Sequence, residues 1–164
     1  MKKFITAILA AACLTAPAWA LDAPKGDVIL VVKGSIANAN VDGTAAFDRD
    51  MLAALPGRKA YMETPWTKGK VEFSGPLLRE VLKAAGAKGH MLKVRALNDY
   101  AAEVPAEDAK LDTILADHQD GEVMSVRDKG PLMLVYPFDE NKDLYNELYF
   151  SRSVWQIKEI EVVE

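Results

Sequence analysis

Short apolar runs that end at turn-forming residues constrain the fold of this chain more than any other feature. The β-branched run at 28–32 and the alternating run at 91–97 are typical of buried and half-buried strands. Asp120-Gly121 is a hairpin signal, and it predicts that segments 111–116 and 122–126 pair. Further strands are expected at 59–64, 71–73, 132–136 and 154–163. Because strands outnumber helices and hairpins join most of them, the sequence predicts a single α+β domain over residues 21–164.

Two segments have the apolar spacing of helices. Residues 76–86 begin with Pro76, whose missing N–H costs nothing in a first helical turn, and end at Gly86, a typical C-terminal cap. Residues 44–55 carry apolar side chains at helical spacing and are stopped by Pro56-Gly57. A third segment, 143–150, is expected to be a short helix or a loop. The predicted domain therefore contains only a few short helices.

The first twenty residues are typical of a secretory signal peptide. Two lysines precede an apolar run at 4–16, and Ala18 and Ala20 occupy the small-residue positions of a cleavage site. The run is shorter than the roughly 20 apolar residues of a membrane-spanning helix. We therefore expect cleavage after Ala20, export to the periplasm and no membrane span in the mature domain. Lipidation at Cys13 is the less favoured alternative, because the apolar run continues beyond it.

The expected cleavage changes the charge and the cysteine content of the chain. Without the two leading lysines, 18 basic residues stand against 24 acidic ones, a formal charge of −6. This charge argues against nucleic acid or an anionic membrane as a partner, since both need a basic surface. Cys13 is the only cysteine, so the mature domain would have no disulfide, no thiolate ligand and no cysteine nucleophile. His90 and His118 lack the spacing of zinc ligands and are expected on the surface.

An ordered set of short motifs makes the chain similar to a known family. The motifs are T-P-W at 64–66, F-S-G-P-L-L at 73–78, A-L-N-D-Y at 96–100, D-G-E-V-M at 120–124, G-P-L at 130–132 and R-S-V-W-Q-I at 152–157. In this order the chain resembles the molybdopterin-binding domain of the sulfite oxidase superfamily, in particular its short exported bacterial members. The resemblance covers roughly residues 59–163. It implies a mixed α+β fold around a pterin cleft, in which a cysteine-ligated oxo-molybdenum transfers oxygen atoms or electrons.

The chain differs from this family in the residues expected to bind the metal. The family's cysteine ligand is expected within residues 60–66, and this stretch contains no cysteine. Met62 offers a neutral thioether and Glu63 a hard oxygen, and neither reproduces a soft thiolate. The lysine pair of the export signal also differs from the arginine pair of the twin-arginine route, by which such enzymes leave the cytoplasm folded. Both departures predict a domain without a cofactor and without a metal site.

The resemblance and these departures together predict a non-catalytic periplasmic domain that acts as a sensor or accessory protein. Its partner would be a small anionic ligand or a periplasmic or membrane protein. The first alternative is an oxidoreductase that binds molybdopterin without a cysteine ligand. The second is an interaction module without a ligand, which would use the aromatic stretch at 145–150.

One group of candidate ligand-binding residues offers aromatic and amide groups. Trp66 lies in a connection and is expected to face a ligand. Asn98, Asp99 and Tyr100 follow a predicted strand and would line the cleft with an amide, a carboxylate and a phenol. The alternative for these three residues is a turn in which Asn and Asp bond their own backbone.

A second group of candidates is basic. Arg127 and Lys129 lie in a charged loop and can hold an anion such as a pterin phosphate or a sulfur oxyanion, although a solvated hairpin connection is an equal alternative. Arg152 is expected near the cleft, where it would pair with the ring of Trp155. Trp155 itself is expected in the core, because it alternates with Ile157 along a predicted strand.

Overall fold

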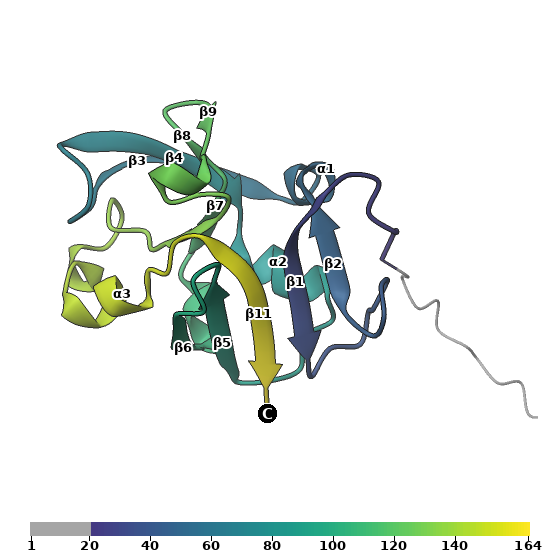
Figure 1. The fold of residues 1–164 in the computed structure, drawn as a ribbon. Coiled ribbons are helices and arrows are strands. Elements are labelled where there is room, and N and C mark those ends of the chain that lie inside the picture. The colour runs from purple at the N-terminus through teal and green to yellow at the C-terminus, as the bar shows by residue number, and fades with distance from the viewer. Residues whose placement is uncertain (1–20) are drawn as a thin grey trace, which may run out of the picture.

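A five-stranded sheet runs through the computed structural model, which describes residues 21–164. Its strands, in spatial order, are β2 (Ala45–Asp48), β1 (Val28–Gly34), β11 (Ile157–Val163), β5 (Met91–Ala96) and β6 (Ala101–Pro105). Strands β1 and β11 are parallel, and all other neighbours in this sheet are antiparallel. Figure 1 shows the last strand, β11, in the middle of the sheet.

A second set of strands crosses one end of this sheet (Figure 1). It consists of a four-stranded antiparallel sheet, β3 (Gly57–Glu63), β4 (Lys70–Pro76), β8 (His118–Gln119) and β9 (Glu122–Val123), and of an antiparallel pair, β7 (Ile114–Ala116) and β10 (Met133–Val135). All residues of β7 and β10 are buried. These two strands therefore join the second sheet to the interior of the protein.

The helical segments are short. They are α1 (Arg49–Ala53), α2 (Leu78–Ala84) and α3 (Glu147–Arg152), with single 3₁₀ turns η1 (Ala106–Lys110), η2 (Val126–Asp128) and η3 (Lys142–Leu144). Helix α2 buries Leu78, Val81 and Leu82 in the one contiguous apolar core, which both sheets share. None of the helices in the described part of the chain is long and apolar enough to cross a membrane.

The structure confirms the α+β class with mixed and antiparallel strands, and it confirms most of the predicted elements. The strands at 28–32 and 91–97 are β1 and β5, and α2 lies within the segment 76–86 that was predicted as a helix. The predicted start is wrong, because Pro76 pairs with Gly57 at the end of β4 and the helix begins only at Leu78. Gly86 follows α2 with a φ of +64°, the conformation that favours glycine after a helix. The signal peptide at 1–20, its cleavage site and the alternative lipidation at Cys13 lie outside the described residues.

Two of the predicted elements are wrong. The segment 44–55 is not one helix, because Ala45–Asp48 pairs with β1 as strand β2, and a helix begins only at Arg49. All four residues of β2 are buried, so the apolar side chains that suggested a helix belong partly to a strand. The turn at Asp120-Gly121 is present, but it joins β8 to β9 and not segment 111–116 to 122–126. Strand β6 was not predicted.

Asp48 holds together the start of α1 and the segment before β1. Its carboxylate accepts hydrogen bonds from the backbone N–H groups of Lys25 (2.7 Å), Gly26 (2.9 Å) and Met51 (2.8 Å). The bonds from Gly26 and Met51 are the main reason that the pKa of Asp48 lies below its ordinary value of 3.8. Ionised Asp48 therefore stabilises the fold more than protonated Asp48 does.

We predict that Asp48→Asn flattens the acid limb of the stability profile. The lowered pKa gives the wild type a stabilisation that is present above the ordinary carboxyl pKa and is lost as the pH falls through the folded-state value. Asparagine keeps an N-cap oxygen but does not titrate. Urea unfolding over a pH series measures the effect, and Asp27→Asn, at an exposed site, is the control. A D48N profile parallel to that of the wild type would contradict this role.

Candidate functional site

A cavity of about 500 Å³ lies between α3, the turn after β5 and the connection between β3 and β4. We call it the aromatic pocket. Its lining residues are Trp66, Ala96, Asn98, Tyr100, Glu147, Phe150, Ser151, Ser153, Val154 and Trp155. Three of the seven residues predicted to bind ligand are among them: Trp66, Asn98 and Tyr100. They come from two connections that are more than thirty positions apart in the sequence, and the fold brings them together.

Trp66 is the central ring of the pocket. The buried hydroxyl of Thr64 accepts a hydrogen bond from the backbone N–H of Trp66 (3.3 Å) and lies 3.1 Å from the Thr67 hydroxyl. These contacts fix the connection between β3 and β4, in which Trp66 lies. The ring of Trp66 meets the rings of Phe150 and Trp155 edge to face, with centroids 5.9 Å and 5.5 Å apart and interplanar angles of 78° and 73°. Such edge-to-face pairs are favourable aromatic contacts.

The segment Asn98–Asp99–Tyr100 is both a turn and part of the pocket. The Oδ1 atom of Asn98 accepts a hydrogen bond from the Tyr100 N–H (3.2 Å), and Asp99 has a φ of +64°. Asn98 and Tyr100 line the pocket, whereas the carboxylate of Asp99 accepts a bond from Nζ of Lys158 (2.7 Å) on β11. That bond and the lysine charge lower the pKa of Asp99. The turn therefore separates Asp99 from its two neighbours.

Trp155 was expected in the core, and this prediction is wrong. Its side chain is 38% exposed and lines the aromatic pocket, while Ile157 is fully buried. Gln156 between them has a φ of +55°, which breaks the alternation of a strand. Strand β11 begins only at Ile157, so Trp155 is free to face the pocket.

Arg152 does not line the pocket, because it binds a buried carboxylate. Asp108 is 6% exposed and accepts hydrogen bonds from the Tyr136 hydroxyl (2.7 Å) and from Nη1 of Arg152 (3.1 Å). Burial raises the pKa of Tyr136, and the bond to Asp108 raises it further, so this phenol stays a donor. The guanidinium of Arg152 also lies 5.6 Å from the ring centre of Tyr149. Arg152 thus anchors α3 to η1.

The other two basic candidates, Arg127 and Lys129, lie in and after η2 and are not among the residues that line the pocket. Arg127 is exposed. Lys129 ends η2 with a φ of +70°, and its carbonyl accepts a hydrogen bond from the Gln156 N–H (2.9 Å). Of the predicted ligand-binding residues, Asp99, Arg127, Lys129 and Arg152 are therefore placed outside the aromatic pocket.

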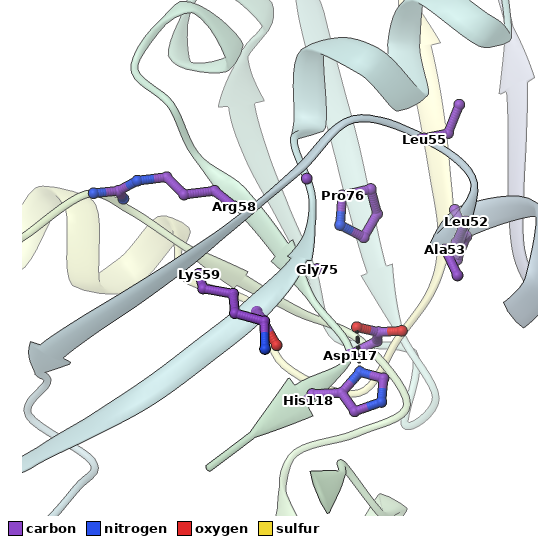
Figure 2. A pocket seen from close by; sticks show the side chains of 11 residues that line it. Leu52, Ala53, Leu55, Arg58, Lys59, Gly75, Pro76, Asp117 and His118 are labelled. Carbon is purple, nitrogen blue, oxygen red and sulfur yellow. Dashed lines mark hydrogen bonds and ion pairs between the residues drawn. The ribbon is translucent and has the colours of Figure 1, made fainter. Parts of the chain in front are cut away.

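A second pocket, of about 340 Å³, contains a residue pair that the sequence analysis missed. Figure 2 shows Asp117 and His118 side by side in it, with Arg58 directed away from them. Asp117 is 3% exposed; its Oδ1 atom lies 2.8 Å from Nδ1 of His118, and its Oδ2 atom lies 3.5 Å from Nη1 of Arg49. The buried carboxylate of Asp117 therefore orients the imidazole of His118. The sequence predicted only that His118 is a surface residue, and it did not predict this contact.

The contact between Asp117 and His118 could not be predicted because it depends on the local path of the backbone. Neighbouring residues of a strand point to opposite faces, so an adjacent Asp-His pair in a strand gives no signal of mutual contact. Here the chain changes partners at Asp117, between β7, which pairs with β10, and β8, which pairs with β4. No group of three or more metal-ligating side chains occurs among residues 21–164.

Met62, in the stretch 60–66 where the resemblance puts a cysteine ligand, is 1% exposed and belongs to the apolar core. Glu63, next to it, is exposed. Neither residue lines the aromatic pocket; both line a separate cavity of about 750 Å³, whose lining also includes Lys70 and Lys142. The stretch from Ala60 to Trp66 therefore contributes one aromatic ring to the pocket and no metal donor.

We predict that Arg152→Met lowers the free energy of unfolding by about 3 kcal/mol, because it leaves the buried carboxylate of Asp108 without its cation. Arg127→Met, at an exposed position, is the matched control and should stay within about 0.5 kcal/mol of the wild type. Urea unfolding followed by circular dichroism measures both. Equal effects of the two substitutions would contradict the anchoring role of Arg152.

Comparisons with known proteins agree on one family and one fold. A family model described as "Oxidoreductase molybdopterin binding domain" matches residues 48–164. Among solved structures, the sulfane dehydrogenase SoxCD from Paracoccus pantotrophus is similar, with a TM-score of 0.59 and 19% sequence identity. The similarity covers 81% of this chain but only 37% of the SoxCD chain, so it concerns the fold of one part of that enzyme. No curated protein matches the chain.

Proposed function

The chain belongs to the oxidoreductase molybdopterin-binding domain family, and we propose that it is a non-catalytic member that binds a small organic ligand in the aromatic pocket. The family resemblance and the sulfite-oxidase-type fold predicted from the sequence are confirmed by the family match and by the similarity to SoxCD. The function proposed within that family rests on the residues that this chain has in place of a molybdenum site.

The residues present do not fit a cysteine-ligated molybdenum. Residues 21–164 contain no cysteine. Met62 is held in the apolar core, and a thioether is a weaker donor than a thiolate. Glu63 is exposed and outside the aromatic pocket, and its hard oxygen does not replace a soft sulfur. The chemistry of the available donors thus supports a member of the family that works without the metal.

Among residues 21–164, those that line the aromatic pocket include no lysine or arginine that would hold a pterin phosphate. Phosphate groups are held by arginine and lysine side chains or by backbone N–H groups at helix N-termini. Glu147 is the one charged residue that lines the pocket among residues 21–164, and it is acidic. Arg152, the basic residue of the same helix, is bound by Asp108.

The lining of the pocket carries the positive part of the proposal. Binding sites for small molecules combine apolar and aromatic walls with a few polar groups that fix orientation. Here Trp66, Phe150 and Trp155 supply the walls, and the Asn98 amide and the hydroxyl of Tyr100 are among the polar groups of the lining. Tyr100 is 54% exposed, which leaves it accessible to a ligand.

We further propose that the domain acts in the periplasm, as a sensor or accessory protein. The signal-like segment at 1–20 supports export, and the formal charge of −6 in the remaining chain argues against a nucleic-acid partner. Tyr145 and Leu148, which are 44% and 52% exposed, give a protein partner apolar contacts close to α3. An effect of ligand binding on such a partner would pass through this helix.

We predict that the protein isolated from its native periplasm contains far less than one molybdenum and one pterin per chain. Elemental analysis and the fluorescence of oxidised pterin measure the two groups. N-terminal sequencing of the same sample should start at Leu21, which also tests the export signal. Near-stoichiometric molybdenum and pterin would overturn the proposal in favour of an oxidoreductase that works without a cysteine ligand.

A further inference from the structure

We propose that the aromatic pocket selects a small organic cation, such as a quaternary ammonium group, over a neutral or anionic ligand. This inference rests on the proposed function and names the class of ligand for the same site. It is carried by three observations: the charge of the lining residues, the aromatic rings that line the pocket, and the ion pair that Arg152, on the same helix as Glu147, forms with Asp108.

The charge of the lining has one sign. Within residues 21–164, the pocket is lined by Glu147 and by no lysine or arginine. Arg152 lies on the same helix as Glu147, but its guanidinium is 3.1 Å from the buried Oδ2 of Asp108. Arg152 therefore neutralises the carboxylate of Asp108 and not that of Glu147, and Glu147 can interact with a positive ligand. An excess of acidic residues in the chain adds a weaker attraction at longer range.

The ring of Trp66 is parallel neither to Phe150 nor to Trp155, so these rings do not form a stacking slot for a flat ligand. A planar heterocycle is held best between two parallel ring faces. The ring of Trp66 is nearly perpendicular to that of Phe150 (78°) and to that of Trp155 (73°). All three rings line the pocket, and a cation within about 6 Å of an aromatic face is attracted by the ring quadrupole.

The sequence predicted an anionic ligand because three basic residues were expected at the binding site, but the structure places all three outside the aromatic pocket. Arg127, Lys129 and Arg152 do not line the pocket. An anion in the pocket would face the carboxylate of Glu147 without a compensating cation from the lining, which is unfavourable. Anion binding is therefore the competing outcome of the test.

The chain offers a direct optical probe of this pocket. Trp66 and Trp155 are the only tryptophans of residues 21–164, and both line it. The mature protein is titrated with choline, with its uncharged isostere 3,3-dimethylbutan-1-ol and with sulfate, while tryptophan emission is followed. We expect choline to cause a saturable change with a roughly tenfold lower Kd than the neutral alcohol, and sulfate to cause none.

A matched pair of variants isolates the carboxylate. Glu147→Gln should weaken choline binding by roughly three- to tenfold, because it removes the charge and keeps the shape, and should leave the binding of the neutral alcohol unchanged. Glu122→Gln, at an exposed glutamate of β9, is the control and should leave both titrations as in the wild type. Circular dichroism verifies that both variants are folded.

Other results overturn the cation site in recognisable ways. Equal affinity for choline and the alcohol would make the pocket a merely apolar one, and saturable binding of sulfate would make it an anion site; in both cases the proposed ligand-binding function survives. A lack of saturable change with all three probes also contradicts the cation site. The proposed function itself fails separately, through the molybdenum and pterin measurement.

Discussion

The buried carboxylate of Asp108 links three segments of the chain through side-chain hydrogen bonds. It binds the hydroxyl of Tyr136, which follows β10, and the guanidinium of Arg152, at the end of α3. The hydroxyl of Thr113 donates to the Asp108 carbonyl (2.7 Å), so the backbone of η1 is fixed as well. A carboxylate buried to this degree is tolerated only because both donors are present. This contact and the packing of Tyr149 and Phe150 against neighbouring rings together position α3, and with it one wall of the aromatic pocket.

The ion pair between Asp108 and Arg152 also affects the charge of the aromatic pocket. Helix α3 has an acidic residue, Glu147, at one end and Arg152 at the other. The buried carboxylate binds the arginine, so the pocket above α3 is left with an acidic lining. A structural requirement of the core thus sets the electrostatics of a surface site.

Local signals in the sequence were sufficient for much of the fold. Alternation and turn residues predicted β1, β5 and α2, because each of these elements buries a face with a regular period. The signals failed where one residue serves two elements. Asp48 ends β2 and caps α1, and the apolar residues on both sides of it have a spacing that suits a single helix. Strand β6 was missed because its residues are mostly small or charged, and its pairing with β5 defines it.

The site was less predictable, for a different reason. Trp66, Asn98 and Tyr100 could be selected because they stand in connections, where side chains are free to face a ligand. The partners of Arg152 and His118 could not, since Asp108 is distant in sequence from Arg152, and the contact between Asp117 and His118 exists only because the chain changes strand partners there. Trp155 was misplaced because a single positive φ at Gln156 reverses the face of the residue before it.

The central position of β11 has a consequence for how the domain is made. This strand pairs with β1 on one side and β5 on the other, and a Cβ added to Gly34 of β1 would lie only 2.2 Å from the Val162 carbonyl oxygen. Until residues 157–163 have been synthesised, β1 and β5 have no common neighbour and the larger sheet has a gap in its middle. Closure of the larger sheet therefore depends on pairings between residues 28–34, 91–96 and 157–163, which lie far apart in the sequence.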